Sequence, residues 1–122
     1  MYEVTIKRSF SAAHLLREIG GQCEALHGHN FHVEVSVGGE GLNDEGLLVD
    51  FRLVKRWTDA VIAELDHKYL NELSLFAGIN PSSENIARLL FERIAEEAKR
   101  VPLTVSRVTV WESENSKVSY SR

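Results

Sequence analysis

Three of the five histidines and the only cysteine of this chain lie between positions 14 and 29. His27 and His29 flank one glycine, so on an extended segment their side chains point to the same face. His14 ends the run 10–14, and a neighbouring strand can bring its imidazole to that face. Three imidazoles with an open fourth position form the ligand set of a catalytic zinc ion. The pattern predicts Zn²⁺ at these three residues, although imidazoles also suit iron or nickel.

The cysteine, Cys23, comes four residues before His27. A buried thiol can be simply a small apolar side chain. As a fourth metal ligand it would close the site and make it structural. As a thiolate stabilised by a metal or a protonated histidine, it would act as a base or nucleophile. Composition alone leaves these three alternatives open.

Two further positions carry groups suited to proton transfer or ligand recognition. Asp66 and His67 follow a helical pattern. A carboxylate that orients an imidazole is typical of acid–base catalysis, and a solvated helix end is the alternative. Glu112 shares the parity of Val108 and Val110, so its carboxylate faces the core if they do. A ligand with two adjacent N–H donors would satisfy it there; a strand-end glutamate turned to solvent is the alternative.

Hydrophobic periodicity predicts the elements that must position these side chains. Alternating apolar residues indicate strands, and a period near 3.6 with Asp50 and a serine as caps indicates two helices. The first helix is expected to run to about Leu65, with Phe51 on its buried side. The expected order is β-β-α-α-β-β in one domain of residues 1–122, an α+β fold with a four-stranded antiparallel sheet and two helices on one face. The expected strands are about 2–12, 27–37, 104–112 and 116–121, and the expected helices 51–65 and 83–101.

Composition narrows the class of protein. The chain has 122 residues, 43% of them hydrophobic, and a net charge of −4, which argues against nucleic acid as a partner. No apolar run reaches the roughly 20 residues of a membrane helix, and the start lacks a signal-peptide pattern. A single cysteine fits a reducing cytoplasm. The open edges of a four-stranded sheet favour a homo-oligomer closed into a barrel, and a monomer with a capped edge is the alternative.

Five ordered segments resemble the 6-pyruvoyl-tetrahydropterin synthase family. The resemblance implies the tunnelling fold (T-fold), with barrel-forming trimers paired into a hexamer. It implies zinc on the three histidines, and Cys23, Asp66 and His67 as the catalytic group. Glu112 would anchor the pterin's amino-pyrimidinone edge, with Ser82 and Ser83 also in the substrate site. The matching segments are residues 10–14, Cys23 with 27–31, 65–71, 81–87 and 111–112.

The spacing of the cysteine resembles one subgroup of that family. Three residues separate Cys23 from His27, as in members that make 6-carboxytetrahydropterin for queuosine and other 7-deazapurines. That resemblance implies a zinc-dependent carbon–carbon lyase acting on 7,8-dihydroneopterin triphosphate. The pyruvoyl-forming animal enzymes carry a longer spacer, and a dihydroneopterin-using subgroup has a glutamate nearby, as Glu24 is here. A pyruvoyl-forming synthase and a non-enzymatic zinc-binding assembly protein remain the alternatives.

Overall fold

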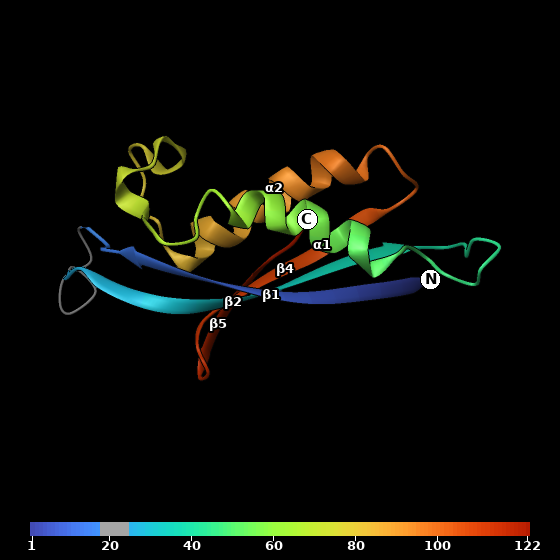
Figure 1. Ribbon diagram of the computed structural model, residues 1–122, viewed down its shortest axis with the longest axis horizontal. Helices are drawn as coiled ribbons and strands as arrows, with labels where there is room; N and C mark the ends of the chain where they lie inside the picture. Colours follow the sequence, from blue (N-terminus) through green and yellow to red (C-terminus); the bar gives the residue numbers. More distant parts are fainter. Residues whose placement is uncertain (18–24) are drawn as a thin grey trace.

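A long antiparallel hairpin of β1 (Tyr2–His14) and β2 (His27–Gly39) forms the centre of the sheet (Figure 1). The computed structural model describes residues 1–17 and 25–122. Strand β4 (Thr104–Ser113) pairs with β2, and β5 (Ser116–Tyr120) pairs with β4, both antiparallel. A two-residue strand, β3 (Lys68–Tyr69), adds in parallel to the end of β1. The order across the sheet is β3-β1-β2-β4-β5.

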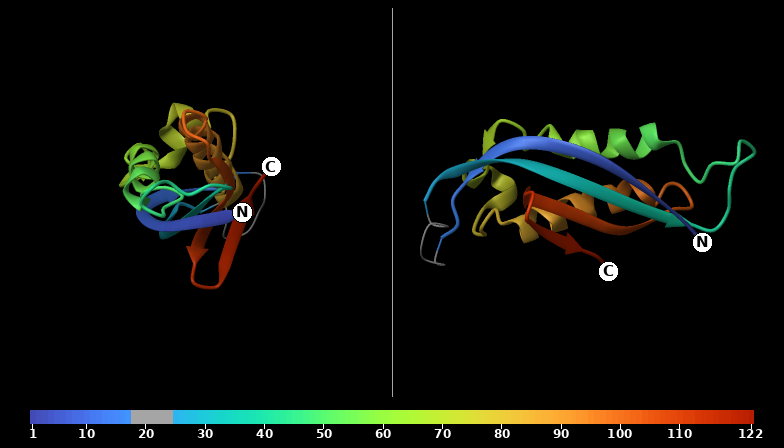
Figure 2. Two further views of the ribbon diagram at one scale, coloured as in Figure 1. Left: turned by 90° about the vertical axis from the view of Figure 1, so that its right-hand side faces the viewer. Right: turned by 90° about the horizontal axis from the view of Figure 1, so that it is seen from below.

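Two helices, α1 (Phe51–Ile62) and α2 (Ser83–Ala98), pack side by side on one face of this sheet (Figures 1 and 2). Asp50 caps α1 by accepting the Arg52 N–H, and the Ser82 hydroxyl caps α2 by accepting the Asn85 N–H. Short 3-10 turns at Leu70–Glu72 and Ser74–Phe76 lead from β3 toward α2. The predicted α+β architecture is therefore confirmed.

The core fills the space between the helices and the inner face of the sheet. Alternate residues of each strand point inward, as the sequence pattern requires. The inward residues of β2 and the apolar stripe of α2 belong to one buried cluster, and all of these side chains are fully buried. Among the described residues, no helix has the length and apolarity needed to cross a membrane. The buried residues include Phe31, Val33, Val35 and Val37 from β2 and Ile86, Leu90 and Ile94 from α2.

Three local expectations were wrong. The sheet has five strands, because β3 pairs with β1 over only two residues and leaves no alternating pattern. Helix α1 ends at Ile62, because residues 63–67 turn toward β1, where the His67 N–H donates to the Ser11 carbonyl at 2.6 Å. Phe51 is 56% exposed, although Val54 and Val61 are buried as expected. The unexpected exposure on the predicted buried side of α1 is confined to its first turn.

Candidate metal centre and its surroundings

Strand register brings the three predicted histidines together. His14 pairs directly with His27 across β1 and β2, and Ala12 pairs with His29. Directly paired residues of an antiparallel ladder point to the same face, so all three imidazoles project to the helix side. Their ring centroids lie 4.5 to 5.4 Å apart. His14 is fully buried, while the side chains of His27 and His29 are about one quarter exposed.

Backbone carbonyls determine which ring nitrogens of this cluster are free. His14 Nδ1 lies 2.8 Å from the Pro81 carbonyl oxygen, and His27 Nδ1 lies 2.6 Å from that of Ala25. A carbonyl only accepts, so each Nδ1 carries the hydrogen and the neutral ring keeps a lone pair on Nε2. Burial lowers the pKa of His14, outweighing the hydrogen bond to Pro81 that raises it, so this ring is held neutral. The rings are thus prepared to donate lone pairs.

Glu112 places a carboxylate against the same three nitrogens. Its Oε1 lies 3.8 Å from Nε2 of His14, 3.8 Å from that of His27 and 2.8 Å from that of His29. An Nε2 lone pair, as on a neutral His14 or His27 ring with its hydrogen on Nδ1, repels a facing carboxylate unless a cation lies between them. The Nε2 atoms of His14 and His29 are buried without a hydrogen-bond partner, a costly state that a metal ion would remove.

These four side chains are the group of described residues that could hold a metal ion. One ligand atom from each lies within 4.8 Å of the others. Nitrogen from imidazole with oxygen from carboxylate is a donor set that zinc accepts in tetrahedral geometry. The zinc implied by the family resemblance therefore fits the residues present. Glu112 was predicted to face the core and bind a pterin, and its contact with the histidine cluster was not foreseen.

The two serines predicted in the substrate site have different surroundings. Ser83 is 6% exposed, and its hydroxyl donates to Glu112 Oε2 at 3.1 Å. The Ser82 hydroxyl accepts the Asn85 N–H at 3.1 Å as the cap of α2. Ser83 therefore touches the cluster through Glu112, whereas Ser82 supports the start of the helix. A substrate contact by either serine stays a prediction.

Asp66 and His67 lie at the edge of β1, beside β3. The Asp66 Oδ1 atom accepts the Ser11 N–H at 2.9 Å. Its Oδ2 lies 3.7 Å from His67 Nε2, which is longer than a hydrogen bond. His67 has a φ of 59°, in the left-handed region that costs a residue with a Cβ about 1 to 2 kcal/mol. Strained backbone of this kind clusters at functional sites. The predicted proton-transfer role stays a prediction.

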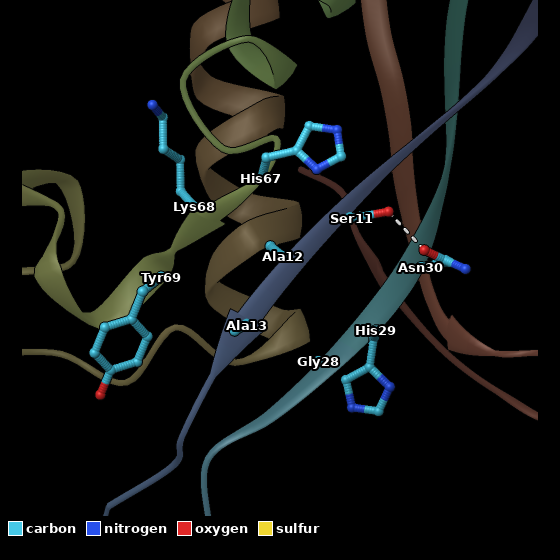
Figure 3. A pocket seen from close by; sticks show the side chains of 9 residues that line it. All are labelled: Ser11, Ala12, Ala13, Gly28, His29, Asn30, His67, Lys68 and Tyr69. Atoms are coloured by element: carbon cyan, nitrogen blue, oxygen red, sulfur yellow. Dashed lines mark hydrogen bonds between the residues drawn. The ribbon is translucent and has the colours of Figure 1, made fainter.

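A hollow of about 550 Å³ lies beside these two residues (Figure 3). It adjoins the cluster through His29 but does not include His14, His27 or Glu112. In this view the His67 side chain comes from the segment on one side of β1, and the His29 side chain comes from β2 on the other side. His67, whose side chain is 82% exposed, is not one of the four residues of the metal cluster. The hollow is lined by Ser11–Ala13, Gly28–Asn30 and His67–Tyr69.

Two asparagine side chains hold the chain that follows His14. The Asn71 amide accepts the Leu15 N–H at 3.0 Å and donates to the Leu15 carbonyl at 2.9 Å. Asn80 makes the same pair of bonds with Arg17, at 2.8 and 2.9 Å. Each amide bonds both backbone groups of one residue beyond the end of β1, as a neighbouring strand would. Neither residue was predicted to have this role; the only signals were that Asn71 ends the matching segment 65–71 and that Asn80 precedes the segment 81–87.

Cys23, the predicted catalytic thiol, lies outside the described residues, as does Glu24. The described neighbours, Arg17 and Ala25, lie on the chain between His14 and His27. The three alternative roles of Cys23, a buried apolar side chain, a fourth metal ligand or a base or nucleophile, therefore stay predictions.

Comparison with known proteins adds an independent finding. A family model described as 6-pyruvoyl tetrahydropterin synthase matches residues 3–122. A provisionally named 6-carboxy-5,6,7,8-tetrahydropterin synthase of Archaeoglobus fulgidus is 40% identical over 114 residues, covering 92% of this chain and 89% of that protein. A dihydroneopterin monophosphate aldolase of Pyrococcus furiosus is 38% identical over 111 residues, covering 89% and 88%. The structure of Caenorhabditis elegans 6-pyruvoyl tetrahydropterin synthase superposes with a TM-score of 0.84 at 27% identity, covering 100% of this chain and 97% of that one.

Proposed function

The chain belongs to the 6-pyruvoyl tetrahydropterin synthase family, and we propose that it is a zinc-dependent 6-carboxy-5,6,7,8-tetrahydropterin synthase. The reaction would convert 7,8-dihydroneopterin triphosphate and water to 6-carboxytetrahydropterin, acetaldehyde and triphosphate. The observation that carries the proposal is the convergence of three imidazoles and the Glu112 carboxylate. The A. fulgidus relative supports the carboxy-forming reaction within the family.

His14, His27 and His29 would hold the metal through Nε2. Zinc bound there would act as a Lewis acid toward the hydroxyls of the substrate side chain. The protein itself fixes the positions of the ligand nitrogens before the metal binds. The Pro81 and Ala25 carbonyls hold two rings in the required tautomer and orientation.

Glu112 would recognise the pterin ring. The pyrimidinone edge offers a ring N–H beside an exocyclic amine, two parallel donors that one carboxylate can accept together. Ser83 holds one carboxylate oxygen, so the orientation of Glu112 is restricted before a ligand arrives. A ligand without the two donors would leave the carboxylate half-buried and unpaired, which gives selectivity.

Proton transfer would fall to Cys23 and His67. By the resemblance, the Cys23 thiolate removes a proton from the substrate side chain, and His67 with Asp66 returns a proton elsewhere. His67 is exposed and held in a strained backbone conformation beside a hollow large enough for a ligand. Strand β1 lies between the segment that carries His67 and strand β2, which carries His29, and this favours a site that a second copy of the chain completes.

A second candidate activity is an aldolase reaction on dihydroneopterin monophosphate. The P. furiosus relative bears that name and is about as similar to this chain as the A. fulgidus relative. Both reactions break a carbon–carbon bond in the side chain of a dihydropterin, so one metal site and one pterin anchor can support either. The number of phosphates on the preferred substrate separates the two candidates.

The deciding experiment is to incubate the zinc-loaded protein separately with dihydroneopterin triphosphate and dihydroneopterin monophosphate. Products are identified by mass spectrometry. We expect 6-carboxytetrahydropterin and acetaldehyde from the triphosphate. Turnover of the monophosphate alone would favour the aldolase, and a pyruvoyl product would place the chain with the pyruvoyl-forming enzymes. No turnover of either substrate by zinc-loaded protein would contradict a pterin lyase.

A further inference from the structure

The Glu112 carboxylate divides its two oxygens between different partners. Oε1 faces the three imidazole nitrogens at 2.8 to 3.8 Å, and Oε2 accepts the Ser83 hydroxyl at 3.1 Å. In a tetrahedral zinc site with bonds of about 2.0 to 2.1 Å, neighbouring ligand atoms lie about 3.3 to 3.4 Å apart. The separations from Oε1 bracket that value. Oε1 therefore lies at distances from the three nitrogens that a fourth ligand of one metal ion could have.

The backbone at Glu112 explains how its side chain reaches this position. Trp111 pairs with Lys117 and Ser113 pairs with Ser116, so Glu112 is the extra residue of a β-bulge between β4 and β5. A bulge releases a residue from the ladder and re-aims its side chain, often beside an active site. Glu112 is also 32% exposed, so water and ligands can compete for its carboxylate.

This position conflicts with a single role for Glu112. A catalytic zinc ion must keep one coordination position for water or substrate. The pterin edge in turn needs both carboxylate oxygens, one of which faces the histidines while the other is held by Ser83. Both requirements are met only if the carboxylate can exchange between two partners.

We propose that Glu112 is an exchangeable fourth ligand of the metal. In the ligand-free protein its Oε1 binds the metal, with Ser83 holding the other oxygen. When a pterin arrives, its paired N–H donors draw the carboxylate away and open the coordination position that the substrate side chain needs. This exchange rests on the proposed function, whereas ligation in the ligand-free protein does not. Recognition of the pterin ring and opening of the metal's fourth coordination position would then occur together.

Cobalt-substituted protein tests ligation directly, because the visible d–d absorption of Co²⁺ responds to coordination number and ligand type. Wild type is compared with Glu112→Gln, Ser83→Ala and, as a matched control, Glu114→Gln in the exposed β4–β5 turn. We expect Glu112→Gln to change the spectrum and weaken metal binding about 10-fold or more in competition with a chelator. Ser83→Ala should weaken it by less, and Glu114→Gln should match wild type. Identical spectra and affinities for wild type and Glu112→Gln would overturn ligation.

Exchange is tested with pterin itself, which carries the ring donors but no side-chain hydroxyls that could bind the metal. Added to the cobalt protein, it should change the wild-type spectrum and leave that of Glu112→Gln unchanged. Lumazine, with a carbonyl in place of the 2-amino group, should change neither. Pterin that binds by calorimetry without changing the wild-type spectrum would overturn the exchange. Failure of pterin to bind at all would contradict the proposed function and the exchange with it, while the ligation result from the variants would stand.

Discussion

At the scale of single residues, the metal cluster depends on imidazoles whose lone pairs have no other partner. His29 contributes a buried Nε2 without a hydrogen bond, whereas His32, three positions along β2, faces the opposite side of the sheet and is exposed. His29→Ala should lower zinc well below one ion per chain after dialysis against a weak chelator, because the site loses one of its three imidazole ligands. Metal analysis by mass spectrometry measures this. His32→Ala is the control and should keep its zinc; equal zinc content in the two variants would contradict the assigned site.

His67 allows a test in which stability and function separate. Its φ of 59° favours glycine, so His67→Gly should be about 1 kcal/mol more stable than His67→Ala in urea unfolding. At exposed Glu96 in α2 the same two substitutions should rank in the opposite order, since glycine weakens a helix by about 1 kcal/mol relative to alanine. Both His67 variants should lose turnover by about 10²-fold or more if the imidazole transfers protons. Unchanged turnover in both would remove His67 from the mechanism.

At the scale of elements, the segment after His14 is positioned by side chains from the connection between the helices. Asn71→Ala leaves the Leu15 N–H and carbonyl, which are partly buried, without the partner that Asn71 supplies. This should cost about 1 to 3 kcal/mol of unfolding free energy, measured by urea denaturation, and speed hydrogen exchange at the Leu15 amide. Asn115→Ala, in the exposed β4–β5 turn, should change stability by about 0.5 kcal/mol or less. An Asn71 variant as stable as this control would show that Asn71 contributes little to holding the segment.

The same elements show what the sequence could and could not reveal. Parity alone placed His27 and His29 on one face with the buried residues of β2, because that inference needs only a local extended backbone. The contact of Glu112 with the histidines could not be predicted, since it depends on a one-residue bulge and on the register between distant strands. The bonds of Asn71 to Leu15 also join residues far apart in sequence. No local pattern records such a pairing.

At the scale of the whole molecule, the described strands leave much of the sheet border open. Strand β3 pairs with only Ala12 and Ala13, so β1 from Tyr2 to Phe10 forms one edge, and β5 forms the other. Open edges of this length invite pairing with further copies of the chain. We predict an assembly in multiples of three, with a hexamer near six times the 13.8 kDa chain mass by light scattering. A monomer at micromolar concentration would contradict this.

Assembly also bears on activity, because His67 is not among the four residues of the metal cluster and the proposed site draws on a second copy of the chain. If copies share each site, mixing two inactive variants, His29→Ala and His67→Ala, and allowing subunits to exchange should restore part of the activity. In such mixtures some sites combine an intact cluster from one copy with an intact His67 from another. Mixed assemblies, verified by mass spectrometry, that stay inactive would indicate that each chain carries a complete site.

The packing of the imidazoles has a consequence for folding as well as for chemistry. The rings of His14 and His29 each meet Phe31 edge to face at 5.5 Å, and Phe31 stacks on Phe10 at 5.0 Å. The ion would therefore bind to the folded core rather than to a separable loop, and mass action then ties its occupancy to the unfolding equilibrium. An ion at 100 times its dissociation constant adds about 2.7 kcal/mol. The melting temperature thus becomes an indicator of metal preference, able to rank zinc, cobalt and manganese with no substrate present.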